Sequence, residues 1–286
     1  MVLGIDGDRR VIIAFISAMM TAVQVQKVSE HLGYSITFLE DAASISKLGS
    51  SDLEPRAEPL FGREAALIEL ISAQQPALLI FDLSNEEVPW QRWVSIIRSS
   101  PATRLVPILC FSPHVDKEAI QAAANLKVDN VVARSRFMAQ MPLLIEQTAR
   151  KDNSEAIKDS CNEPISVVAL EGLEAFNSGN YFDAHEYLEE AWHKDTSASR
   201  DVYKAVLQIA VAYLQIERQN YRGAVKMFLR ARQWLSPLPD FCRGININRL
   251  KDDANQIHQI LVELGPDGLD NFDYSILPPI DYGKPL

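Results

Sequence analysis

The sequence predicts two folds in one chain: an α/β doubly wound, five-stranded parallel sheet, followed by an all-α bundle of helical hairpins. Over the first 150 residues, apolar runs suited to buried strands alternate with helical periodicity, and after residue 165 only helical periodicity follows. A length of 286 residues is also comfortable for two domains. We therefore expect a domain at 1–150, a polar and charged linker at 151–164, and an all-α domain with an extended C-terminal tail at 165–286.

Five apolar runs in the first domain have the length and composition of buried strands. They lie at 11–16, 35–40, 77–82, 106–111 and 130–135, and helical periodicity lies at 18–32, 63–73, 88–99, 116–125 and 137–150. Runs without polar alternation are typical of parallel strands covered on both faces, and this order of strands and helices builds a flavodoxin-like sheet. The long polar insertion at 41–64 is expected to be a mobile loop.

The second domain shows only helical periodicity and a weak internal repeat. Helices are expected at 165–177, 181–194, 200–218, 221–235 and 247–264. The motif Asn-Tyr-x-x-Ala at 180–184 recurs at 220–224, each time after a helix and a tight polar turn. This is the pattern of a tetratricopeptide-like hairpin, in which the small alanine lets two helices approach each other. Two such hairpins predict a small antiparallel bundle.

The composition and charge exclude several classes of function. A net charge of −10 does not suit the binding of nucleic acid or of anionic lipid, both of which need a basic surface. The stretch at 9–23 has two arginines and then an apolar run, as a signal peptide would, but the run is shorter than the roughly 20 residues of a membrane helix. Asp6 and Asp8 spoil the basic start, and no small-residue cleavage site follows, so a buried strand that leads into a helix explains the stretch better. Cys110, Cys161 and Cys242 are far apart and form no CxxC. We therefore expect no disulfide framework, no thiolate zinc site, and a reducing, cytoplasmic location.

Residues 8–148 resemble the CheY-like receiver domain of bacterial response regulators. Asp82, in "LLIFDLSN", lies where that family has its phospho-acceptor aspartate, and Ser112 lies at the hydroxyl position after the fourth strand. The acidic pair that should hold Mg²⁺ is replaced by Phe15 and Ile16, and the lysine after the fifth strand is replaced by Arg134. Phosphoryl transfer to a carboxylate needs a divalent ion. The resemblance therefore implies a pseudo-receiver that is not phosphorylated, with Asp82 satisfied by a turn or by Arg134.

One stretch of the second domain, "NYFDAHEYLEEAWH" at 180–193, concentrates groups that can bind a metal or carry a proton. On a helix, His185, Glu186, Glu189, Glu190 and His193 lie on one face and the apolar side chains lie on the other. This split also describes an ordinary solvated helix face. It is not a zincin motif, because the second histidine is at i+8 rather than i+4.

Two observations favour a functional or structural network over a solvated face. The repeat partner of this helix carries Val, Lys, Leu, Arg and Gln at the matching positions, so the hairpin itself does not require His and Glu there. The next helix is apolar nearly all round but is interrupted by Gln208, and a buried amide needs hydrogen-bond partners. We therefore expect His185, Glu189 and Gln208 to form one hydrogen-bonded network, partly covered by Trp192. The alternative for Gln208 is a bond to a backbone carbonyl at a helix crossing.

The stretches "FNSGNYFDAHEYLEEAWH", "YKAVLQIAVAYLQIERQNYRGAVKMF" and "FCRGININRL" resemble the bacterial and archaeal domain of unknown function numbered 309. The resemblance covers roughly 165–265. Its pattern residues are Tyr181, Ala184, His185, Glu186, Glu189, Trp192, Gln208, Asn220 and Gly223. Members often have a histidine where this chain has Tyr213, which removes one possible metal ligand.

Two functions follow from these patterns. The first is a cytoplasmic regulatory or interaction protein, with a protein partner or a second copy, in which His185, Glu186, Glu189, Trp192, Gln208 and Asn220 form a binding or structural network. The second is a metal-dependent hydrolase, the activity with which the family is sometimes labelled. His185 and Glu189 would then bind a divalent transition metal and Glu186 would act as the base.

Overall fold

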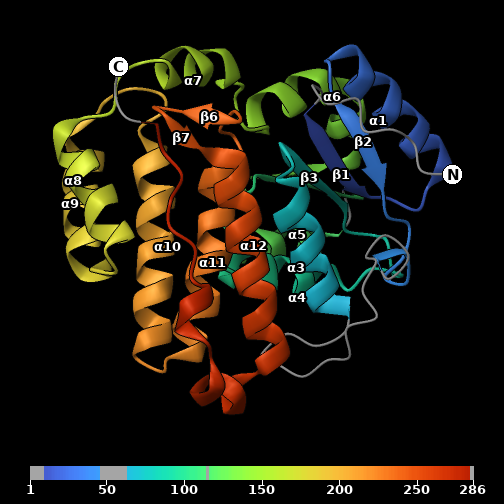
Figure 1. The fold of residues 1–286 in the computed structure, drawn as a ribbon. Coiled ribbons are helices and arrows are strands. Elements are labelled where there is room, and N and C mark those ends of the chain that lie inside the picture. Colours follow the sequence, from blue (N-terminus) through green and yellow to red (C-terminus); the bar gives the residue numbers. More distant parts are fainter. Residues whose placement is uncertain (1–9, 46–62, 114–115, 284–286) are drawn as a thin grey trace, which may run out of the picture. The chain divides into compact units, whose positions relative to one another are not determined.

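The computed structural model describes residues 10–45, 63–113 and 116–283 (Figure 1). The chain divides into two compact units, the first ending at Lys151 and the second beginning at Asp152. Most of the insertion predicted at 41–64 lies outside the described residues.

The first unit contains a parallel sheet with the strand order β2-β1-β3-β4-β5. The strands are β1 (Val11–Phe15), β2 (Ser35–Phe38), β3 (Leu78–Asp82), β4 (Ile108–Ser112) and β5 (Asn130–Ala133). The helices are α1 (Met19–His31), α3 (Arg63–Gln74), α4 (Trp90–Ser99), α5 (Lys117–Asn125) and α6 (Arg134–Thr148). This arrangement confirms the predicted doubly wound α/β fold.

Helices cover both faces of this sheet, which explains why its strands are continuously apolar. Because side chains alternate along a strand, Ile13 and Phe15 pack on one face with α3, α4 and α5, whereas Ile12 and Ala14 pack on the other with α1 and α6. Because the strands are parallel, the carboxyl ends of β1, β3, β4 and β5 lie at the same edge of the sheet.

The second unit is built of helical hairpins, as predicted. Its helices are α7 (Ser154–Cys161), α8 (Val167–Asn177), α9 (Tyr181–Lys194), α10 (Asp201–Glu217), α11 (Tyr221–Leu235) and α12 (Ile247–Leu264). Consecutive helices from α8 to α11 pack against one another, and their inner faces form one apolar core with α12. A two-stranded hairpin, β6 (Phe241–Cys242) and β7 (Ile245–Asn246), lies between α11 and α12.

The two halves of the internal repeat use the same turn. Asn180 and Asn220 cap α9 and α11, and each side-chain oxygen accepts a hydrogen bond from the backbone N–H three residues on. The residue before each cap has a positive φ, 81° at Gly179 and 57° at Gln219. Gly172 lets α8 approach α9 closely, because a Cβ there would lie 2.9 Å from Leu188 Cγ.

The C-terminal segment was expected to be an extended tail, and the structure shows two short 3-10 helices before the extended part. These are η1 (Pro266–Asn271) and η2 (Tyr274–Ile276). Ile280 then exchanges two hydrogen bonds with the Asn177 side chain and is buried. The tail is thus fixed to the end of α8.

Two expectations from the sequence are wrong in this unit. The segment 151–164 contains the helix α7, so it is not simply a linker. Cys161, at the end of α7, forms a disulfide with Cys242 on β6, whereas Cys110 is free and buried. The two bonded residues are 81 positions apart in the sequence, and only the folded hairpin brings their Cα atoms to 4.3 Å. Their spacing alone therefore gave no indication of a pair.

Among the helices of the described residues, none combines the length and the hydropathy that crossing a membrane requires.

Candidate functional site

At the carboxyl edge of the sheet, Asp82 is buried and bound on both sides. Its side chain is 2% exposed, and Arg134 Nη2 donates to its two oxygens at 2.8 and 2.7 Å. Ser84 donates to Oδ1 from its backbone N–H at 3.1 Å and from its hydroxyl at 2.7 Å. A turn and an arginine together thus provide hydrogen-bond donors for the carboxylate at the position where receivers are phosphorylated.

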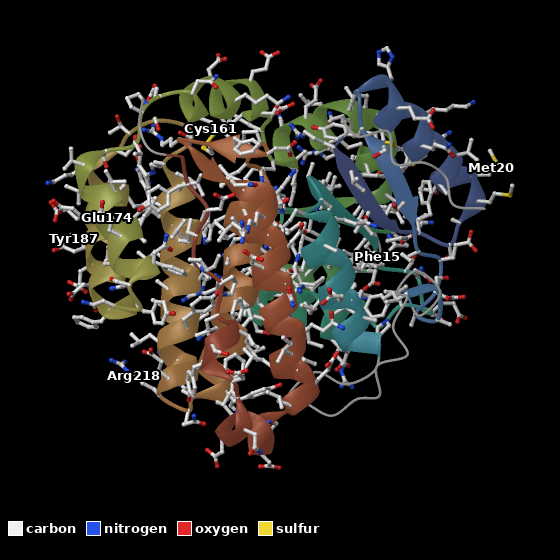
Figure 2. The ribbon with its side chains drawn as sticks, in the orientation of Figure 1. Phe15, Met20, Cys161, Glu174, Tyr187 and Arg218 are labelled. Atoms are coloured by element: carbon white, nitrogen blue, oxygen red, sulfur yellow. A yellow bond between two sulfur atoms is a disulfide. The ribbon has the colours of Figure 1, made fainter. Side chains whose placement is uncertain are left out.

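Hydrocarbon occupies the adjacent end of β1. Phe15, labelled in Figure 2, and Ile16 are fully buried. Phe15 stacks on Phe81 with ring centroids 4.1 Å apart and meets the edge of Trp93. These side chains offer no oxygen ligand to a cation. Ser112 is also fully buried, and its hydroxyl finds no hydrogen-bond partner among the described residues. The structure therefore brings together Asp82 and Arg134, while the Ser112 hydroxyl bonds to neither of them.

On the second unit, the polar face of α9 holds a small cluster of possible ligands. His185 Nδ1 lies 3.1 Å from Glu186 Oε1, and His185 Nε2 lies 4.0 Å from Glu189 Oε2. Glu189 also lies 4.0 Å from His193, and Glu190 is paired with Lys194. Of the first three side chains, His185 is 28% exposed, Glu186 60% and Glu189 46%. The cluster is open to solvent, with His185 as its most sheltered member.

His185, Glu186 and Glu189 can each direct one ligand atom to a common point. These atoms lie within 4.8 Å of one another. One imidazole nitrogen and two carboxylate oxygens suit a borderline cation such as Zn²⁺ or Mn²⁺. All three come from a single helix, and exposed groups of this kind are common without a metal. The arrangement is thus chemically able to bind a cation weakly.

The network predicted for His185, Glu189 and Gln208 stays a prediction, because no direct hydrogen bond between Gln208 and either residue is seen among the described residues. Within the described part of the chain, Gln208 Oε1 is buried and has no hydrogen-bond partner. α9 turns its apolar side into the core, where Ala184 and Leu188 are buried, and His185 and Glu189 are partly exposed beside it. Lys204, one turn before Gln208 on α10, packs against the indoles of Trp192 on α9 and Trp234 on α11.

Trp192 connects α9 to α10, and its ring lies 4.7 Å from that of His193. Its indole N–H donates to the Asp201 carboxylate at 3.0 Å. The Lys204 ammonium lies 3.8 Å from the centroid of this indole and 4.3 Å from that of Trp234 on α11. A cation between two indoles stabilises the contact of three consecutive helices.

Asn220 and Tyr213 have local structural roles. The Asn220 side chain caps α11 and donates to Gln215 Oε1 at 2.7 Å. Tyr213 is 2% exposed, lies among the rings of Phe176, Tyr181 and Phe228, and its pKa is raised by burial. Its position on the core side of α10 means that a tyrosine here serves packing.

A second polar cluster, around Arg243, was not predicted. Arg243 is 7% exposed and forms ion pairs with Glu163 at 3.0 Å and Asp195 at 3.1 Å. It also donates to the hydroxyls of Ser197 and Ser199. The sequence did contain one signal of a hairpin here, the dipeptide Arg-Gly between "FC" and "IN". In the structure both residues have a positive φ, as a two-residue hairpin turn requires. The burial of the arginine could not be read from that signal.

Sequence comparison agrees with the motifs of the second unit. The model of a domain of unknown function, DUF309, matches residues 169–227, which contain the cluster on α9 and Gln208 on α10. This confirms the resemblance expected from the spaced motifs. None of the curated proteins compared with the chain matches its sequence.

Solved structures similar to the first unit include response regulators. The phosphorylated cyanobacterial phytochrome response regulator RcpA is 13% identical, with 49% of this chain and 90% of that chain covered and a TM-score of 0.37. For a response regulator from Hahella chejuensis these values are 11%, 48%, 92% and 0.37. For the chemotaxis response regulator CheY4 of Vibrio cholerae they are 11%, 49%, 98% and 0.36. Identities this low concern the fold alone.

Proposed function

We propose that this chain is a regulatory or interaction protein that combines a non-phosphorylated receiver-like module with a helical module carrying His and Glu. The observation that carries the proposal is the state of Asp82. An acceptor carboxylate must be free to attack a phosphoryl group, but this one is buried, paired with Arg134 and bound by Ser84. With phenylalanine and isoleucine at the end of β1, the module offers a fixed surface in place of a phosphorylation switch.

Incubation with acetyl phosphate and Mg²⁺, followed by intact mass spectrometry, tests the loss of phosphorylation. We expect no phosphoryl adduct on the wild type. The matched control is Asp82→Asn, which lacks the acceptor but keeps the shape. Stoichiometric addition of one phosphoryl group that disappears in this variant would contradict the proposal.

For the interaction itself, we propose that the helical module binds a protein partner or a second copy. On α9, Phe182 is 53% exposed, and Tyr187, which borders Gly172 of α8, is 38% exposed. Phe182 is one turn from His185 and Glu186, so aromatic and charged groups are adjacent on this face. Light scattering over a range of concentrations, with chemical cross-linking, tests the assignment. Cross-links should include α9, and Phe182→Ser should weaken them more than Tyr274→Ser on η2.

A cytoplasmic location and a role in signalling are part of this proposal. The acidic composition supports an interaction that involves neither nucleic acid nor anionic membrane. Fractionation of cells that produce the chain at its natural level tests the location.

The alternative function is a metal-dependent hydrolase, favoured by the convergence of His185, Glu186 and Glu189. His185 and Glu189 would hold the ion and Glu186 would serve as base. In that case, Zn²⁺ or Mn²⁺ should raise the melting temperature of the wild type and not of His185→Ala, because a ligand stabilises the state that binds it. Under the preferred function, neither the metals nor EDTA changes the melting temperature. The variant His193→Ala serves as the control for loss of an exposed histidine.

A further inference from the structure

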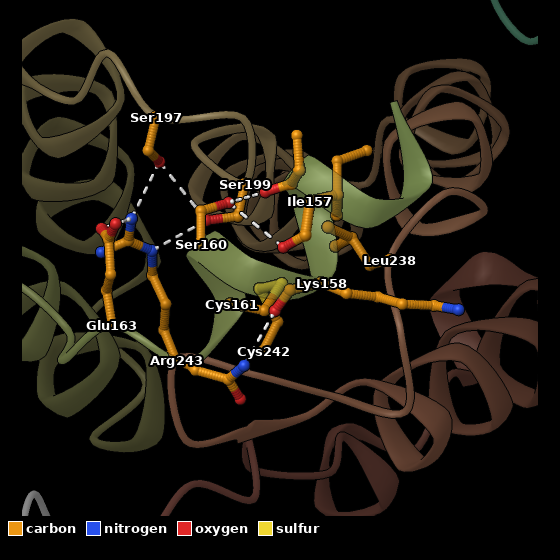
Figure 3. The surroundings of a disulfide bond; sticks show 12 residues. Ile157, Lys158, Ser160, Cys161, Glu163, Ser197, Ser199, Leu238, Cys242 and Arg243 are labelled. Carbon is orange, nitrogen blue, oxygen red and sulfur yellow. Dashed lines mark hydrogen bonds and ion pairs between the residues drawn. A yellow bond between two sulfur atoms is a disulfide. The ribbon is translucent and has the colours of Figure 1, made fainter. Parts of the chain in front are cut away.

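The disulfide joins the connecting segment between the two units to the body of the second. Cys161 is the last residue of α7, and Cys242 is on β6, just before the hairpin turn (Figure 3). The first unit ends at Lys151, so only residues 152 and 153 separate it from α7. The bond therefore fixes the chain close to the point where it leaves the first unit.

Apart from this bond, α7 is weakly held. Most of its side chains are exposed, Ile157 is half-buried against the apolar core, and Ser160 bonds to carbonyls of its own helix. The backbone N–H of Arg243 donates to the carbonyl of Cys161 at 2.7 Å. A helix of eight residues is not stable alone in water. The covalent bond thus supplies the anchoring that the packing of α7 lacks.

The chain beyond α7 is held independently of the disulfide. Arg243 binds the Glu163 carboxylate at 3.0 Å (Figure 3). It also binds the Pro164 carbonyl at 3.1 Å, and its guanidinium forms an ion pair with Asp195. The Ser166 side chain caps α8 directly afterwards. Loss of the disulfide would therefore free the chain before Glu163 and leave the helical hairpins in place.

We propose that Cys161 and Cys242 form a redox-active pair, and that its reduction by a dithiol releases α7 from the second unit. One thiolate of the dithiol attacks Sγ of Cys161, the bond between the two protein sulfurs breaks, and Cys242 leaves as a thiolate and takes up a proton. The second thiol of the reductant attacks the mixed disulfide and frees Cys161. Two electrons pass to the protein, and the reductant becomes a disulfide. Cys161 is the sulfur attacked because it is 5% exposed, whereas Cys242 is fully buried.

Release lengthens the part of the chain that is not packed on the second unit. The packing on this unit begins at Ser154 in the oxidised protein and at Glu163 in the reduced protein, so release adds residues 154–162. At about 3.4 Å per extended residue, these nine residues have a maximum length of about 30 Å. The redox state thereby sets the length of chain that is released from the second unit. This inference goes beyond the proposed interaction function and does not depend on the cluster on α9.

Hydrogen exchange of the full chain, before and after treatment with dithiothreitol, tests the proposal. Alkylation under native conditions should add two labels on reduction, at Cys161 and Cys242. Amides of α7 should then exchange at least about tenfold faster, as expected for a melted segment, while those of α10 and α11 keep their protection.

The double variant Cys161→Ser/Cys242→Ser should reproduce the reduced pattern without reductant and should not respond to it. The matched control is Cys110→Ala, which should behave as the wild type. Unchanged protection of α7 after complete reduction would overturn the proposal. So would loss of protection throughout the second unit, which would identify the bond as a structural staple, or the absence of the disulfide under mild oxidation.

Discussion

Replacing Arg134 by Met removes the positive partner of Asp82 and keeps most of the volume of the side chain. Asp82 is 2% exposed, and breaking a buried ion pair by removing one partner costs about 3–5 kcal/mol. Two features reduce this cost: Arg134 is 36% exposed, and Ser84 still donates two hydrogen bonds to the carboxylate. We therefore expect Arg134→Met to lower the free energy of unfolding of the first unit by about 2–3 kcal/mol.

Native-state hydrogen exchange of the amides of β3 and β4 measures this free energy within the intact chain. Arg136→Met is the matched control, because Arg136 is exposed on the same helix and bonds only to Gln140 among the described residues. It should cost less than about 0.5 kcal/mol.

A double-mutant cycle isolates the charge pairing from other effects of the substitution. In the Asp82→Asn background no buried carboxylate remains, so Arg134→Met should cost less than about 1 kcal/mol. The reasoning is refuted if the substitution costs the same in both backgrounds, or if the buried carboxylate tolerates the loss of the arginine at no cost.

Three further predictions concern the second unit. Burial, assisted by the charge of Arg232, lowers the pKa of His258 to about 3. The histidine is therefore neutral in the folded protein, whereas in the unfolded protein it takes up a proton near pH 6.5. Its contribution to the free energy of unfolding is present above pH 6.5 and is lost as the pH falls toward 3. Urea titrations should show about 2 kcal/mol lost between pH 6.5 and pH 5 in the wild type, and a shallower loss in His258→Phe. Gly172→Ala should cost about 1–3 kcal/mol in thermal unfolding, because its Cβ would meet Leu188 at 2.9 Å; an unchanged melting temperature would show that this leucine moves aside. Asn220→Ala should cost about 1 kcal/mol through loss of a helix cap, as measured by urea unfolding, and a much larger loss would show a role beyond capping.

The helices and strands could be predicted because their cause is local. Apolar periodicity of 3.6 or continuous apolar runs decide which side chains can be buried, and the paired motifs at 180–184 and 220–224 mark the start of two helices by their asparagine caps. By contrast, α7 is polar and short, and a residue 81 positions away anchors it. No local pattern carries that information.

In the candidate site, too, local features could be predicted from the sequence and long-range contacts could not. The position of His185, Glu186 and Glu189 on one face follows from helix geometry, and the structure places their ligand atoms within 4.8 Å. The network predicted for Gln208 depends on how α10 packs against α9, which the sequence of either helix does not determine. The burial of Arg243 likewise depends on acids and hydroxyls from several separate segments.

The placement of the tryptophans gives each unit its own optical reporter. Trp90 and Trp93 are buried in the first unit, whereas Trp192 and Trp234 enclose an ammonium group in the second. These are all four indoles of the chain. With Phe at 192 and 234, the emission would come from the first unit alone, and with Phe at 90 and 93 from the second alone. The wavelength and intensity of tryptophan fluorescence would thus report the order in which the two units unfold in an otherwise intact chain.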